Sequence, residues 1–187
     1  MTALLTSTKQ WFLTNEQAAF FIKVVFGSLM IALFAQISVP MYPVPITGQT
    51  LAVTVVGLAL GRKAGISAVL LYLAQGAIGL PVFANGVGGI AAFFGPTGGY
   101  LYGFIAAVAI LGYFSDKGIL KSYVMSTLVA LVATAAVFVF GLLHLSFFVP
   151  SESLLQFGLY PFIIGGIIKA VLAAALVVPT HKFFSKL

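Results

Sequence analysis

Residues Phe162–Val178 read FIIGGIIKAVLAAALVV, and this stretch decides the fold. An apolar run of this length predicts a helix that crosses a lipid bilayer. Its middle holds Lys169, the only charged side chain between Glu152 and Lys182. A lone ammonium group at membrane depth costs about 3 kcal/mol even on lenient insertion scales. We therefore expect Lys169 to have a specific partner.

No acidic side chain of the chain is placed to be that partner. The only acids are Glu16, Asp116 and Glu152, and all three fall in polar or loop-like surroundings. This indicates that the anion is a ligand. The alternative is a lysine that extends to the membrane surface with its stem on apolar neighbours. That arrangement suits helix ends better than the mid-helix position of Lys169.

The composition sets the class of protein. Of 187 residues 61% are hydrophobic and 6% are charged, whereas soluble domains carry about 25% charged residues. We expect an all-α integral membrane protein with a single transmembrane domain, residues 1–187. There are no cysteines, which excludes disulfide and thiolate chemistry. Two distant histidines and no carboxylate cluster argue against a metal site, and no catalytic constellation is visible. We expect neither an enzyme nor a cofactor.

Six membrane segments are expected after an N-terminal cytoplasmic segment, residues 1–19. The second is short, which in transporters points to a binding site. The predicted spans are residues 20–39, 49–60, 64–82, 100–114, 123–143 and 160–178.

The basic residues orient these segments. With both termini in the cytoplasm, every Lys and Arg except Lys169 falls on the cytoplasmic side, and the outer loops carry none. This is the positive-inside pattern of a multi-pass plasma membrane protein. The spread of these residues in ones and twos does not suggest nucleic acid binding. The eight are Lys9, Lys23, Arg62, Lys63, Lys117, Lys121, Lys182 and Lys186.

Both long outer loops are rich in glycine and proline. Residues 40–49 contain three prolines within six positions, and residues 79–99 are glycine-rich and apolar. Irregular apolar backbone is tolerated at membrane depth only where it is buried in protein or lines a cavity. We therefore expect an outward-facing pocket that is covered by these loops and floored by Lys169.

Four further residues are candidates for ligand binding. Asn85 offers amide donors and an acceptor, although Asn beside Gly also suits a left-handed turn. Gln49 lies where the first loop enters the second segment, and Thr47 there is better explained as a helix cap. The aromatic residues Tyr42 and Phe83 are the candidates from the two loops themselves.

Small residues mark one side of the first segment. Ser28, Ala32 and Ala35 stand near four-residue spacing, which allows close helix approach. They form either a face that docks a partner or an internal packing face, and the sequence favours neither.

Three ordered motifs resemble the BioY family, the biotin-binding S components of energy-coupling factor transporters. The run 43–50, PVPITGQT, resembles the family's first loop. Residues 76–84, GAIGLPVFA, with 95–100, GPTGGY, are similar to its central signature. Pro161-Phe162 followed by Gly165 through Lys169-Ala170 resembles its last-helix motif. The resemblance covers about Phe26 to Ala175.

The resemblance implies six helices around an outward-facing biotin pocket, with the first loop as a lid. It implies that Lys169 and Asn85 belong to the biotin site, Lys169 as the anchor for the valerate carboxylate. It also implies a transmembrane coupling subunit and two cytoplasmic ATPase subunits as partners. Biotin is then the substrate, and no cofactor is implied.

One position departs from the family pattern. An acidic residue usually stands three positions before the lysine, and here that position is Gly166. The absence of this acid strengthens the case that a ligand carboxylate is the partner of Lys169. It leaves open how the ureido ring is recognised. Two other functions remain: a stand-alone carrier for biotin or a related carboxylate, and a non-transporting membrane assembly protein.

Overall fold

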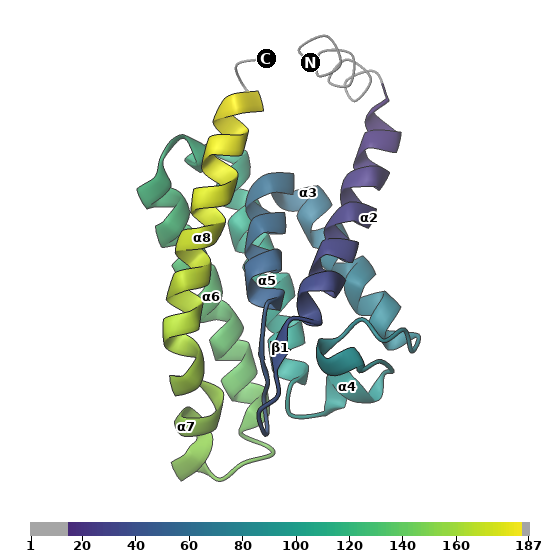
Figure 1. The fold of residues 1–187 in the computed structure, drawn as a ribbon, viewed down its shortest axis with the longest axis vertical. Helices are drawn as coiled ribbons and strands as arrows, with labels where there is room; N and C mark the ends of the chain where they lie inside the picture. Colours follow the sequence, from purple (N-terminus) through teal and green to yellow (C-terminus); the bar gives the residue numbers. More distant parts are fainter. Residues whose placement is uncertain (1–14, 185–187) are drawn as a thin grey trace.

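Long apolar helices make up most of the computed structural model, which describes residues 15–184 (Figure 1). Within these residues, five helices are long and apolar enough to cross a membrane. The protein is therefore an all-α membrane protein, as the composition predicts. These helices are α2 (Glu16–Ala35), α3 (Gln49–Ala77), α5 (Gly98–Asp116), α6 (Tyr123–Leu145) and α8 (Tyr160–Phe184).

Short elements connect the helices. Between α2 and α3, β1 (Ser38–Val39) pairs antiparallel with β2 (Ile46–Thr47). We call this connection, residues 36–48, the strap. The remaining short elements are η1 (Ala84–Gly86), α4 (Ala91–Phe94), η2 (Ile119–Lys121), η3 (Ser151–Ser153) and α7 (Leu154–Gly158).

Helix α3 is a helical hairpin that reverses at Gly61 (Figure 1). Gly61 has φ 74° and ψ −176°, a backbone conformation that side chains with a Cβ rarely adopt. The two halves pack closely, because a Cβ on Gly65 would lie 3.6 Å from the Cα of Gly57. At the turn, the Asp116 carboxylate accepts a 3.2 Å hydrogen bond from the Arg62 backbone N–H. The predicted break between residues 49–60 and 64–82 coincides with this turn.

Two helices end before the predicted membrane segments do. Helix α2 ends at Ala35 rather than at residue 39, because the chain enters β1 and then meets Pro40, which disfavours helix in the residue before it. The second half of α3 ends at Ala77 rather than at residue 82. Gly79 there has φ 100° and Pro81 follows. Helices α5, α6 and α8 run slightly beyond the predicted 100–114, 123–143 and 160–178.

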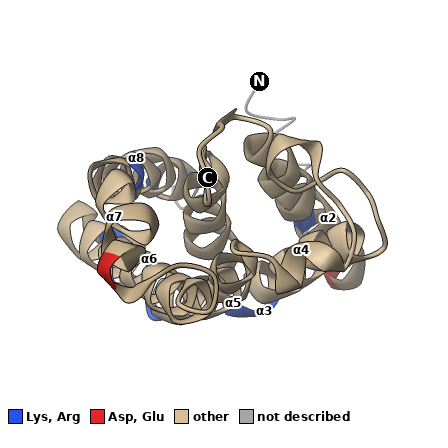
Figure 2. Ribbon diagram, turned by 90° about the horizontal axis from the view of Figure 1, so that it is seen from below, with Lys and Arg blue, Asp and Glu red and all other residues tan. Residues whose placement is uncertain are grey.

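The helices form an arc around the first half of α3. Helix α3 packs against α2, α5 and α8, while α6 joins α5 to α8. Figure 2 shows how few charged residues this bundle carries. The helix contacts bury Leu58, Val108 and Leu111 completely, whereas Phe21 and Leu143 are exposed on its outer surface. Exposed apolar side chains on this surface suit contact with lipid.

The small residues of α2 pack inward, which favours the internal-packing interpretation of this face, and the docking role stays a prediction. Ser28 is fully buried and its hydroxyl donates a 2.8 Å hydrogen bond to Oε1 of Gln75 on α3. Ala35 is fully buried as well, and Ala32 is half-buried against the core. A Cβ on Gly27 would come within 2.9 Å of the Ala68 Cβ. Small side chains here let α2 and α3 approach each other.

Candidate ligand-binding site

A cavity of about 250 Å³ lies between the strap, the loop after α3, and helices α5, α6 and α8. The strap and the start of α3 contribute Met41, Pro43, Val44, Pro45, Thr47, Gln49 and Thr50. The loop and α4 contribute Phe83, Ala84, Asn85, Val87 and Ala92. The other lining residues are Thr97, Tyr100, Leu101, Phe104, Thr134, Val137, Phe138, Phe162, Gly166 and Lys169. Aromatic side chains with a few polar groups are typical of small-molecule sites.

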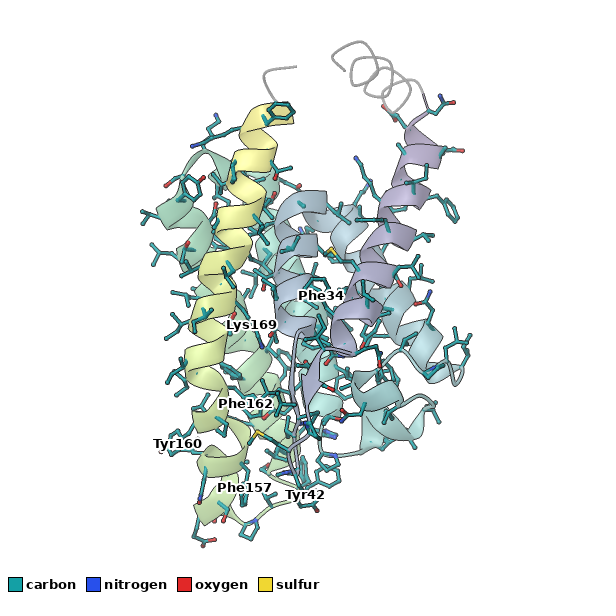
Figure 3. All side chains as sticks on the ribbon, in the orientation of Figure 1. Phe34, Tyr42, Phe157, Tyr160, Phe162 and Lys169 are labelled. Carbon is teal, nitrogen blue, oxygen red and sulfur yellow. The ribbon has the colours of Figure 1, made fainter. Side chains whose placement is uncertain are left out.

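Lys169 is the one charged residue among those that line this cavity in the described part of the chain. Figure 3 shows it on the inner side of α8, with Phe162 nearer the start of the helix on the same side. A spacing of seven residues puts both on one helix face. The ammonium group of Lys169 donates a 2.6 Å hydrogen bond to the carbonyl oxygen of Thr47. The sequence missed this partner, because a backbone carbonyl leaves no trace in residue identity.

Thr47 and Gln49 form a hydrogen-bonded polar pair beside Lys169. The Thr47 hydroxyl donates to Oε1 of Gln49 at 3.0 Å and accepts from the Gln49 backbone N–H at 3.3 Å. The Gln49 amide nitrogen also donates to the hydroxyl of Tyr72. Gly48 occupies the cap position of α3, while the Thr47 hydroxyl accepts from the N–H of the first helical residue, Gln49, which is the capping contact that the sequence suggested. Gln49 lines the cavity, and its contact with a ligand stays a prediction.

Asn85 has both features that the sequence suggested. Its φ of 58° places it in the left-handed region, and it lines the cavity. Its Oδ1 accepts a 2.6 Å hydrogen bond from the Ser38 hydroxyl, which ties the loop to the strap. Gln36 adds a second tie, accepting from the Gly86 N–H at 3.1 Å and donating to the Phe83 carbonyl at 3.2 Å.

Phe83 forms part of the cavity wall and is almost completely buried. Its ring meets Tyr72 edge-on, with centroids 5.4 Å apart. Gly76 makes room for it, since a Cβ there would overlap the Phe83 ring. The glycine of the central motif is thus a close-packing position.

Tyr42 does not line the cavity. Its side chain is 90% exposed at the tip of the strap (Figure 3), whereas its neighbours Met41 and Pro43 line the cavity. Successive side chains of an extended segment point to opposite sides. The placement of Tyr42 therefore does not support a ligand contact.

The aromatic wall is what the sequence did not predict. Tyr100, Phe104, Phe138 and Phe162 face the cavity from three helices. The Tyr100 hydroxyl donates a 2.7 Å hydrogen bond to the Gly158 carbonyl, which fixes its ring. Only Phe162 had a usable signal, its seven-residue spacing from Lys169. The others lie in segments that are apolar on every side.

Gly166 also lines the cavity and is buried. A Cβ at this position would lie 3.2 Å from Cγ2 of Thr134 and 3.5 Å from the Phe138 ring. The glycine therefore opens the cavity between α6 and α8, one helical turn before Lys169. Within residues 15–184, no group of His, Cys, Asp and Glu side chains is arranged to hold a metal ion.

Fold and site together define a multi-pass membrane protein with an internal small-molecule cavity. The aromatic wall and the single lysine suit the binding of a small molecule that carries an anionic group. The chain belongs to the BioY family, whose model matches residues 6–186.

Named relatives cover most of the chain. It is 36% identical over 162 residues to the biotin transporter BioY of Thermotoga maritima, covering 86% of this chain and 95% of the relative. It is 40% identical over 139 residues to a probable biotin transporter BioY of Pyrococcus horikoshii, covering 74% and 82%. A crystal structure of the S-component for biotin from an ECF-type ABC transporter superposes with a TM-score of 0.80 and 32% identity, covering 90% of this chain and 93% of that one.

Proposed function

We propose that this chain is the substrate-binding subunit of a biotin importer and captures biotin from outside the cell. The observation that carries the proposal is Lys169, the single cation of a cavity whose lining holds no Asp or Glu among the described residues. Biotin pairs one carboxylate, on an apolar chain, with a fused ring system that has an apolar sulfur-containing ring and a polar ureido ring. The carboxylate meets Lys169, since a charge-assisted hydrogen bond is the strongest contact the site offers.

The rest of the ligand is matched by the cavity walls. The apolar sulfur-containing ring lies against the aromatic wall, where Phe138 and Phe162 bury surface. The ureido group needs both donors and acceptors, and the amide of Asn85 supplies them, while the Gln49 amide is engaged by Thr47 and Tyr72 at the carboxylate end. Gly166 contributes no acceptor, so Asn85 takes a larger share of ureido recognition.

The positions of the basic residues support a cytoplasmic location for both termini. Arg62 lies at the turn of α3 beside Asp116 at the end of α5, and Lys182 stacks over Tyr123 at the start of α6. Figure 1 places these ends on the same side as both termini, opposite the strap. With α3 crossing twice, the chain crosses the membrane six times and the cavity opens to the outside.

Transport is powered by partner subunits. The match to an S-component from an ECF-type ABC transporter supports a complex with an energy-coupling module. In our proposal this module consists of one transmembrane subunit and two cytoplasmic ATPases. The chain itself is a non-enzymatic binding subunit without a cofactor. Lipid and the coupling subunit cover its apolar outer surface.

The test is binding of biotin and biotin methyl ester to the purified protein in lipid nanodiscs. Biotin should bind at least about tenfold more tightly, because the ester has no charge to pair with Lys169. Equal affinities for acid and ester would remove the carboxylate anchor, and no binding of either would refute the proposal. Uptake in cells without any coupling module would instead establish a stand-alone carrier.

A further inference from the structure

Three hydrogen bonds, joined through the Gln49 side chain and through Thr47 itself, link the protein core to the cavity lysine. The link starts at Tyr72, whose side chain is 0% exposed and does not line the cavity. The Gln49 amide nitrogen donates to the Tyr72 hydroxyl, and the Thr47 hydroxyl donates to the Gln49 carbonyl oxygen at 3.0 Å. The Thr47 carbonyl in turn accepts from Lys169 at 2.6 Å.

These contacts hold Thr47 in place, and with it the backbone carbonyl that accepts from Lys169. Gln49 contacts Thr47 twice, through its side-chain oxygen and its backbone N–H. The Gln49 side chain is itself buried and held at its far end by Tyr72. Buried polar groups lose much free energy when a partner is removed, so the members of such a network hold one another in place.

The ammonium group of Lys169 sits at the open end of the network. It carries three donors, and Thr47 takes one of them. The direction of that bond sets where the other two donors point. A lysine has four rotatable side-chain bonds, so without this contact its head group would sample several positions in the cavity.

We infer that Tyr72 is a positioning residue for carboxylate recognition: through Gln49 and Thr47, its hydroxyl sets the place of the Lys169 ammonium group. The inference rests on the proposed function and deepens it. Tyr72 contacts no ligand in this scheme. Gln49 and Thr47 separate it from Lys169, the residue that contacts the ligand carboxylate.

The substitution Tyr72→Phe removes only the hydroxyl and keeps the ring, including its edge-on contact with Phe83. Biotin affinity should fall about five- to tenfold, the effect of one lost network hydrogen bond. Affinity for biotin methyl ester should change much less, because the ester does not use the charge of Lys169. Thr47→Val removes the hydroxyl that bonds Gln49 and nearly keeps the shape of the side chain. It should lower biotin affinity to a similar extent.

A double-mutant cycle separates positioning from a general structural role. In a Lys169→Met background, Tyr72→Phe should leave the remaining biotin affinity unchanged, since no ammonium group is left to position. A packing defect would lower the affinity in both backgrounds. Tyr102→Phe is the matched control. Its hydroxyl donates to the Phe93 carbonyl at 3.2 Å outside the cavity lining, and biotin affinity should not change.

Additive effects in the cycle, or equal losses for acid and ester, would overturn the inference. So would wild-type affinity in both Tyr72→Phe and Thr47→Val, even while Lys169→Met binds biotin weakly and the proposed function stands. If the wild-type protein binds no biotin, the inference falls together with the proposed function. If Tyr72→Phe does not fold, the Thr47→Val cycle with Lys169→Met decides by the same criteria.

Discussion

The ammonium group of Lys169 donates a 2.6 Å hydrogen bond to the carbonyl oxygen of Thr47, 122 residues earlier in the chain. The bond joins the last long helix to the strap across the cavity. It leaves two N–H donors of the lysine for a ligand. A charge that no acid of the cavity lining neutralises is thereby held at a defined place in the wall.

Replacing Lys169 with Met should weaken biotin binding by about ten- to a hundredfold, because the ligand carboxylate loses its charge-assisted partner. Binding of biotin methyl ester should change little. Isothermal titration in nanodiscs measures both. Lys63→Met is the control, since Lys63 is exposed and lies outside the cavity lining. Undiminished biotin affinity in Lys169→Met would contradict the anchor role.

Asn85→Gly should speed biotin release by several-fold while the melting temperature stays nearly unchanged. Glycine tolerates the φ of 58°, so the change removes the side chain without backbone strain. Ser38→Ala removes the 2.6 Å tie to the strap but keeps the Asn85 amide. A larger effect of Asn85→Gly on the dissociation rate would indicate a direct ligand contact. Equal effects would assign Asn85 to the tie alone.

Gly76→Ala should destabilise the protein by about 1–3 kcal/mol, the usual range for overpacking. The added Cβ would overlap the Phe83 ring and push it into the cavity, so biotin affinity should fall as well. Gly165→Ala is the matched control, because a Cβ there meets nothing within 4 Å and alanine favours helix. Thermal unfolding in detergent distinguishes them. Similar melting temperatures for both variants would argue against the close packing of Gly76.

Gly61→Ala should lower the melting temperature more than Gly118→Ala. Both glycines have positive φ, 74° and 85°. Gly118 has ψ 25°, in the left-handed helical region, where alanine costs about 1–2 kcal/mol. Gly61 has ψ −176°, in a region that essentially only glycine adopts, and a Cβ there would also strike the side chain of Asp116. Equal shifts would contradict both the greater backbone strain at Gly61 and its close contact with Asp116.

The outline of the site was predictable from rare residues. In a chain with 6% charged residues, a lysine inside an apolar segment is conspicuous, and the glycine- and proline-rich loops marked the roof of the cavity. Asn85, Gln49 and Phe83 do line the cavity. Tyr42 does not, because the direction of one side chain in an extended loop depends on a register that composition does not reveal.

The face of α2 was ambiguous for a related reason. Small residues let any two helices approach, so Ser28 and Ala35 fitted docking and internal packing equally well. The hydrogen bond from Ser28 to Gln75 favours internal packing for the buried part of this face. Sequence spacing indicates that a helix face carries small side chains. Only the position of the neighbouring helices shows what covers that face.

By itself, the sequence determined the class of this protein: apolar segments too long and too uncharged for a soluble domain, oriented by lysines and arginines at their ends. This follows from the cost of placing charge and unpaired backbone in hydrocarbon. The tertiary structure decided the partners of the polar groups, above all the Thr47 carbonyl that holds Lys169 and the Tyr72 hydroxyl behind it. Those contacts join segments far apart in the chain. Their geometry comes from helix packing and loop register, which residue identities alone do not encode.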